Sequence, residues 1–170
     1  MTESTLSPLV AGLDLEVMMR EALGEAEAAG RAGEHPIGSV LVIDGQIVSR
    51  GRARHRQRRS QLCHAEMEAL QSGGETLWTR YQYAVLFTTV EPCPMCLGAA
   101  VMADVPHIVF AAHDAVAGMG VAVESIPYLR RHIDTYLGGV LEAESHEVVG
   151  RYNAGSLAYI RGGNGPVDSL

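Results

Sequence analysis

Cysteine is scarce in this sequence: only three occur among 170 residues, and just two of them lie close together. An odd, small number of cysteines does not suit a domain held together by disulfides, so that architecture is excluded. The close pair is Cys93 and Cys96, in the stretch EPCPMC at residues 91–96. In a reducing compartment, a Cys-x-x-Cys pair indicates a metal site or a redox pair. We therefore expect a cytoplasmic protein.

Long apolar runs are also missing. No eighteen apolar residues follow one another, and the opening MTESTLSPLVAGLDL lacks the basic and then apolar segments of an export signal. We therefore expect a protein that is not exported and has no membrane partner. Lysine is absent as well, because all thirteen basic residues are arginines. With 47% hydrophobic residues the chain can build one sizeable core, and we expect a single domain over residues 1–170.

The arginines are unevenly spread. Six of them lie in RGRARHRQRR at residues 50–59, which leaves seven basic residues against all twenty acidic ones elsewhere. The run is either a solvated loop that pairs with nearby acids or a site for a substrate phosphate or an RNA backbone. Proteins that bind nucleic acid usually carry a wider basic face, so the acidic remainder makes nucleic acid the less favoured partner.

Helical and strand-like segments alternate along the chain. We expect strands on either side of the Asp44-Gly45 turn and a C-terminal tail from about residue 155 to residue 170. Alternation of this kind predicts an α/β fold, a three-layer α/β/α arrangement with a mixed sheet of about five strands and helices on both faces. The expected helices are 14–33, 62–74, 94–105, 126–132 and 142–152, and the expected strands are 39–43, 46–50, 83–89, 107–112 and 133–137.

Three potential metal ligands begin two of these helices. His64 stands at the start of the helix 62–74, and Cys93 and Cys96 stand at the start of the helix 94–105. Strand-to-helix junctions in a parallel arrangement meet at one edge of a sheet, so the three side chains can converge there. Helix N-termini favour thiolates, and one imidazole with two thiolates suits zinc.

Three protein ligands leave one tetrahedral position for water, as in catalytic zinc sites. Zinc lowers the pKa of such a water to about 7. Glu66 follows His64 by two residues and can take a proton from the water and return it to a substrate. The alternative is a closed structural zinc knot with Cys63 as the fourth ligand. Cys63 is adjacent to His64, and neighbours on a helix point about 100° apart, which disfavours this alternative.

HAE at residues 64–66 followed by PCPMC at 92–96 resembles the zinc-dependent cytidine and deoxycytidylate deaminase superfamily. The similarity runs from about Pro36 to Asp114, and EPCPMCLGA is most similar to bacterial guanine deaminases and tRNA adenosine deaminases. The resemblance implies a cytidine deaminase-like fold, one zinc ion per subunit and a homodimer. It also implies that Glu66 shuttles protons and that the backbones of Ala65 and Glu91 face the substrate. Asp114 either lines the pocket and accepts from a ring N–H or caps its own loop.

One position departs from the family. Many relatives have an asparagine in a stretch like RGxN, whereas this chain has RGRA, with Ala53 in that place. A missing hydrogen bond at a buried polar edge costs roughly 1 to 3 kcal/mol, or about 5- to 150-fold in affinity. Either another residue replaces the asparagine or the substrate lacks that edge.

Three functions follow from these observations. The leading one is zinc-dependent hydrolytic deamination of a small nucleobase, nucleoside or related aminated heterocycle, with release of ammonia. The second is deamination of adenosine in a tRNA loop, supported by the EPCPMC motif and the arginine run. The third is a zinc-stabilised binding module without catalytic activity, for which Ala53 is the only support.

Overall fold

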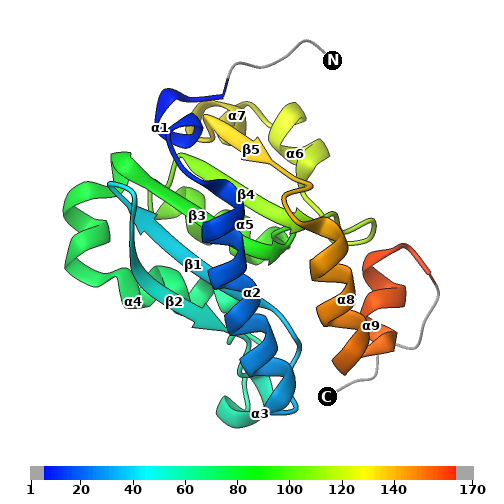
Figure 1. Cartoon of the computed structure of the whole chain (residues 1–170). Coiled ribbons are helices and arrows are strands. Elements are labelled where there is room, and N and C mark those ends of the chain that lie inside the picture. The colour runs from blue at the N-terminus through cyan, green and yellow to red at the C-terminus, as the bar shows by residue number, and fades with distance from the viewer. Residues whose placement is uncertain (1–5, 164–170) are drawn as a thin grey trace.

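The computed structural model, described here for residues 6–163, contains a five-stranded mixed sheet between two layers of helices (Figure 1). The strand order is β2-β1-β3-β4-β5, with β1 antiparallel to both β2 and β3, and with β3, β4 and β5 parallel. The predicted α/β class and number of strands are confirmed. The strands are β1 (Gly38–Ile43), β2 (Gln46–Arg52), β3 (Ala84–Val90), β4 (His107–Ala112) and β5 (Thr135–Leu137).

Helices cover both faces of the sheet because the side chains of its central strands alternate between two cores. Along β1, Val40 packs into one core and Leu41 into the other. The core that contains Val40 lies under α2 and α8, which Figure 1 shows in front of the sheet, and the core that contains Leu41 lies under α4 and α5. These helices are α2 (Leu15–Arg31), α4 (Ala65–Arg80), α5 (Pro94–Met102) and α8 (Glu142–Tyr152).

Short elements connect this framework. The remaining helices are α1 (Pro8–Ala11), α3 (His55–Arg58), α6 (Gly120–Ser125), α7 (Pro127–His132), α9 (Ala154–Ile160) and the 3-10 turn η1 (Tyr81–Tyr83). No helix in the described range 6–163 is both long and apolar enough to span a bilayer.

Two local features fix the strand β2 and the helix that follows it. Asp44 and Gly45 both have positive φ angles, 52° and 74°, as the predicted two-residue hairpin turn requires. Gly51 lies under α4, where a Cβ atom would overlap the backbone of Ala65 and Ala69. The absence of a side chain at Gly51 therefore lets the first turn of α4 rest directly on the sheet.

The structure contains helical segments that were not expected from the sequence, among them the short helices α1 and α6. The helix expected to end at Gly74 does end there, because Gly74 has non-helical φ and ψ angles of 49° and −133°, but a second helical segment that was not expected follows it to Arg80 within α4. A four-residue helix, α3, lies inside the arginine run, which we had expected to be a loop. Residues expected in the C-terminal tail form α9, and Asn153 caps this helix by accepting a hydrogen bond from the Ser156 amide. The rest of the expected tail, residues 164–170, lies outside the described range.

Candidate active site

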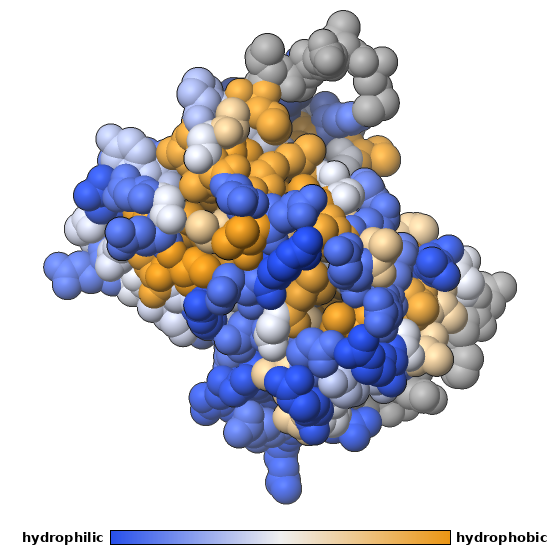
Figure 2. All heavy atoms as spheres, viewed as in Figure 1, coloured by the Kyte–Doolittle hydropathy of each residue, from blue (hydrophilic) through white to orange (hydrophobic). Residues whose placement is uncertain are grey.

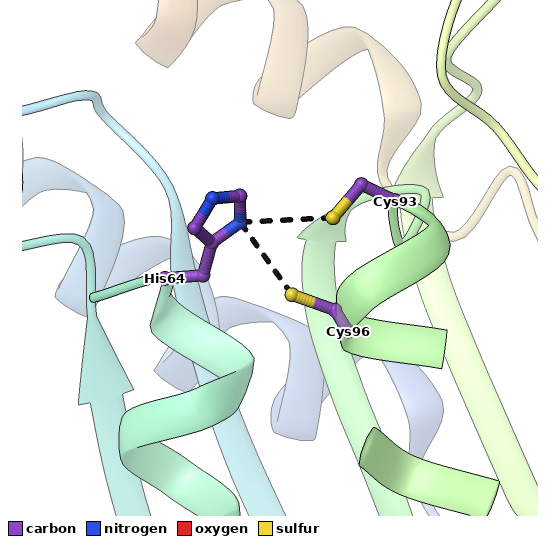
Figure 3. Close-up of side chains that lie close together, drawn as sticks. All are labelled: His64, Cys93 and Cys96. Carbon is purple, nitrogen blue, oxygen red and sulfur yellow. Dashed lines mark hydrogen bonds between the residues drawn. The ribbon is translucent and has the colours of Figure 1, made fainter. Parts of the chain in front are cut away.

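The three predicted ligands meet at one edge of the sheet (Figure 3). Because β2 and β3 are both antiparallel to β1, they run in the same direction, and the helices that follow them begin at the same edge. His64 is the N-cap of α4, Cys93 is the N-cap of α5, and Cys96 lies in the first turn of α5. The Nδ1 atom of His64 lies 3.8 Å from Sγ of Cys93 and 3.5 Å from Sγ of Cys96.

All three donor atoms lie within 4.8 Å of one another, close enough to share one ion. Among the residues that the structure describes, this group has no fourth histidine, cysteine or carboxylate member. Cys63 is therefore not placed with the other two cysteines, although it precedes His64 directly. The arrangement matches an open three-ligand site better than a closed four-ligand knot.

The electrostatics of the group favour a thiolate. Hydrogen bonds from the Cys96 thiol and from His64 lower the pKa of Cys93 to about 3. The same hydrogen bond with Cys93, together with burial, raises the pKa of Cys96. The hydrogen bond with Cys93 also raises the pKa of His64. These shifts favour a thiolate at Cys93, the form of cysteine that binds metal ions.

Glu66 lies in the first turn of α4 and is only 4% exposed. Its Oε2 atom is buried and has no hydrogen-bond partner in the described chain. Burial raises the pKa of this carboxyl group. A buried carboxyl with a raised pKa beside a metal-binding group is well suited to accept and return a proton.

A cavity of about 300 Å³ opens at this edge of the sheet. Of the seven residues predicted for the site, all but Cys96 line the cavity, and Cys96 is fully buried behind them. The predicted residues that line it are His64, Ala65, Glu66, Glu91, Cys93 and Asp114. The volume is at the lower end of the range found for small-molecule sites, which is about 300–1,000 Å³.

The side chains of Glu91 and Asp114 hold the wall of the cavity together. The Glu91 carboxylate accepts hydrogen bonds from the backbone amides of Asp114 (3.1 Å) and Gly120 (2.9 Å) and from the Tyr136 hydroxyl (3.1 Å). Oδ1 of Asp114 accepts from the backbone amides that follow it, those of Val116 (2.9 Å) and Ala117 (2.8 Å). One oxygen of Asp114 is thus engaged in its own loop, as the alternative loop-capping role requires.

Two histidines and a helix in the cavity wall were not predicted from the sequence. His35 and His55 both line the cavity, and His55 is 6% exposed, although neither has ligand spacing with the cysteines in the sequence. The ring of His55 packs edge-on against those of His35 and His64, with centroids 5.2 Å and 4.9 Å apart. Residues at the start and end of α9, including Asn153 and Ile160, form another part of the wall.

The arginine run divides into a paired half and an unpaired half. Three arginines on and just after β2 form ion pairs with glutamates: Arg50 with Glu21 (2.7 Å), Arg52 with Glu25 (3.6 Å) and Arg54 with Glu68 (3.2 Å). Arg56, Arg58 and Arg59 are exposed and have no ion pair in the described part of the chain. Figure 2 shows the hydrophilic end of the molecule where α3 lies.

The N-terminal end of α3 is held by Glu34, which lies more than twenty positions earlier in the sequence. The buried carboxylate of Glu34 accepts hydrogen bonds from the backbone amides of Arg56 (2.9 Å) and Gln57 (2.8 Å). These are amides of the first helical turn, which have no partner inside the helix. Glu34 therefore caps α3 and holds His55 in the cavity wall.

A family profile and a related protein of known name both match this chain. The family profile "Cytidine and deoxycytidylate deaminase zinc-binding region" matches residues 14–112. The "tRNA-specific adenosine deaminase" of Bacillus subtilis (strain 168) is 39% identical over 132 residues, which are 76% of this chain and 82% of that protein.

Two solved structures are also similar. A chain described under "Biochemical and Structural Studies of A-to-I Editing by tRNA:A34 Deaminases at the Wobble Position of Transfer RNA" is 35% identical, with a TM-score of 0.69 and coverage of 78% of this chain and 98% of that one. The guanine deaminase from Bacillus subtilis is 30% identical, with a TM-score of 0.54 and coverage of 66% and 76%. With the metal-binding motif in place, this chain belongs to the cytidine and deoxycytidylate deaminase family.

Proposed function

We propose that this protein is a zinc-dependent hydrolytic deaminase that replaces the amino group of an aminated nucleobase with an oxo group. The observation that carries this proposal is the convergence of His64, Cys93 and Cys96 in one cavity wall, with the buried carboxyl of Glu66 beside them. Water is the second substrate and ammonia the second product.

The donor set fits zinc. One imidazole nitrogen and two cysteine sulfur atoms are ligands that favour zinc over magnesium or calcium, and the lowered pKa of Cys93 favours its thiolate form. His64, Cys93 and Cys96 would hold the ion. When bound, zinc lowers the pKa of a coordinated water so that hydroxide is available near neutral pH.

The chain itself supplies the proton transfers and the orientation of the ring. Glu66 takes one proton from the water and delivers it to the ring nitrogen beside the reacting carbon. After the hydroxyl group has added to that carbon, Glu66 takes its remaining proton and delivers it to the amino group, which departs as ammonia and leaves the oxo group. Ala65 is the first residue of α4, so its backbone N–H has no partner inside the helix and can donate to the substrate. The Glu91 carbonyl can accept from the amino group that leaves.

A small substrate is the leading candidate. The cavity is small, its wall includes α9 of the same chain, and three of the six clustered arginines are neutralised by glutamates. Together with an overall net charge of −7, these features suit a diffusible base or nucleoside better than a polyanion.

Adenosine in tRNA is a second candidate, and two observations favour it. The Bacillus subtilis relative is named for that substrate, and Arg56, Arg58 and Arg59, beside the cavity-lining His55, have no ion pair with any residue in the range 6–163. This candidate predicts RNA binding that weakens steeply as salt is raised, because the arginines displace counterions from phosphates.

An ammonia-release assay separates the two candidates. The zinc-loaded protein would be given adenine, guanine, cytosine, their nucleosides and nucleotides, a pterin and an aminotriazine, and in a separate arm tRNA transcripts. Glu66→Gln is the matched control, because it keeps the size of the side chain and removes the proton acceptor. Turnover of a small ring supports the leading candidate, and turnover of tRNA alone supports the second. The absence of ammonia in both arms would contradict deamination.

A further inference from the structure

The position where many relatives carry asparagine forms part of the cavity wall. Ala53 lines the cavity and is 1% exposed, and its backbone amide donates to the Ile37 carbonyl (3.1 Å). Its methyl group can neither donate nor accept a hydrogen bond. A polar substrate edge at this point therefore needs a partner from another residue.

His55 is two residues further along the same wall. Its side chain is among the most buried polar groups of the cavity, yet Nδ1 has no hydrogen-bond partner among residues 6–163. Buried polar atoms in folded proteins are nearly always paired, so the unpaired Nδ1 shows that the described residues leave the hydrogen-bonding capacity of His55 unused, in a residue that lines the cavity. His35, the neighbouring histidine, already has a partner, because its Nδ1 lies 3.3 Å from Oγ of Ser156.

The imidazole of His55 is held in a defined orientation. Its ring is clamped edge-on between the rings of His35 and His64. The backbone around it is tied down at both ends: the Arg54 amide donates to the Cys63 carbonyl (3.0 Å), and the Glu34 carboxylate caps the first turn of α3. A preorganised polar group of this kind loses little conformational entropy when a substrate binds.

We propose that His55 is a substrate-binding residue that determines specificity, and that it supplies the hydrogen bond that alanine at position 53 cannot make. This inference rests on the proposed deaminase function and names the residue that recognises the ring. The supporting observation is the imidazole of His55, which is buried, has an unpaired Nδ1 among the described residues, and packs against His64 in the cavity wall that also contains Ala53.

An imidazole in place of the asparagine side chain changes which substrates can bind. A carboxamide presents a donor and an acceptor side by side, whereas a neutral imidazole presents one donor on one nitrogen and one acceptor on the other, pointing in different directions. The preferred substrate is therefore an aminated heterocycle with a single hydrogen-bonding atom at the edge facing His55. A ring that presents an adjacent donor and acceptor there leaves one of them unpaired.

Two variants test the inference. His55→Phe keeps an aromatic ring between His35 and His64 but removes both nitrogens, and His55→Asn restores a polar group near the same place. The steady-state constants kcat and KM would be measured on each panel substrate that the wild-type protein turns over. Zinc content and melting temperature of each variant would be measured in parallel, because His55 packs against a proposed ligand.

We expect His55→Phe to lower kcat/KM by about 5- to 150-fold, mainly through KM, with zinc content unchanged, and His55→Asn to recover part of the loss. Turnover by His55→Phe within twofold of wild type, at equal zinc content, would overturn the inference and leave the proposed function intact. Should His55→Phe lose zinc or fail to fold, His55→Asn decides, since an unchanged preference among the panel substrates contradicts a role in specificity. Absence of turnover by the wild-type protein would defeat the proposed function, and the inference with it.

Discussion

Replacing Glu91 with glutamine tests whether its carboxylate anchors the cavity wall. The carboxylate is 8% exposed and accepts three hydrogen bonds, from the Asp114 amide, the Gly120 amide and the Tyr136 hydroxyl. A glutamine side chain keeps one carbonyl oxygen, which can still accept from Gly120 and Tyr136. Its NH₂ group then faces the Asp114 amide, donor against donor.

The expected loss of unfolding free energy follows from these three hydrogen bonds. Loss of one hydrogen bond to a charged group costs about 1.5–3 kcal/mol, and the two remaining bonds weaken because their acceptor is no longer charged. We therefore expect the free energy of unfolding to fall by about 3 kcal/mol, a large share of the roughly 5–15 kcal/mol typical of a domain. Burial and the nearby carboxylate raise the pKa of Tyr136, so its hydroxyl stays protonated and able to donate.

The assay is urea denaturation followed by far-UV circular dichroism, because the single tryptophan, Trp78, is 81% exposed and is a poor probe of unfolding. Tyr136→Phe is the control: it removes only one of the three hydrogen bonds and should cost less than Glu91→Gln. A loss below about 1 kcal/mol for Glu91→Gln, or a larger loss for Tyr136→Phe, would refute the anchoring role.

Two further predictions concern the C-terminal helix and the pH dependence of stability. Asn153→Ala removes the cap of α9, which should cost about 1 kcal/mol, speed amide hydrogen exchange in residues 154–160 and raise KM; unchanged exchange would contradict this. Burial lowers the pKa of His107 below 6.5, so the unfolded chain binds the proton more readily, and stability is full above pH 6.5 and falls as the pH drops below it. His107→Gln should make the loss of unfolding free energy between pH 7.5 and pH 5.5 smaller than in the wild-type protein. Urea unfolding that gives the same loss for both proteins would contradict the role of His107.

The metal-binding group was predictable because its signals are local. His64, Cys93 and Cys96 stand at helix starts, and the direction of the preceding strands brings those starts together. The hairpin turn was predictable for the same reason, since Asp44 and Gly45 tolerate the positive φ angles that it needs. Short sequence motifs thus gave both the topology near the site and the residues that form it.

The missed features depend on contacts between distant parts of the chain. A four-residue helix such as α3 is not stable alone, and it forms here because Glu34 caps it from more than twenty positions earlier in the sequence. Helix α9 has no strong periodic pattern in its seven residues, and its position depends on burying Ile160 against Val90 and Val149. The place of His55 in the cavity follows from α3, so no local signal pointed to it.

The coordination of the bound metal tests the central claim most directly. X-ray absorption at the zinc edge would be recorded on the purified protein. The account predicts two sulfur ligands at about 2.3 Å, from Cys93 and Cys96, and two lighter ligands at about 2.0–2.2 Å, one from His64 and one from water. A third sulfur would mean that Cys63 closes the site as in a structural zinc knot, and a protein that binds no zinc would contradict the proposed chemistry altogether.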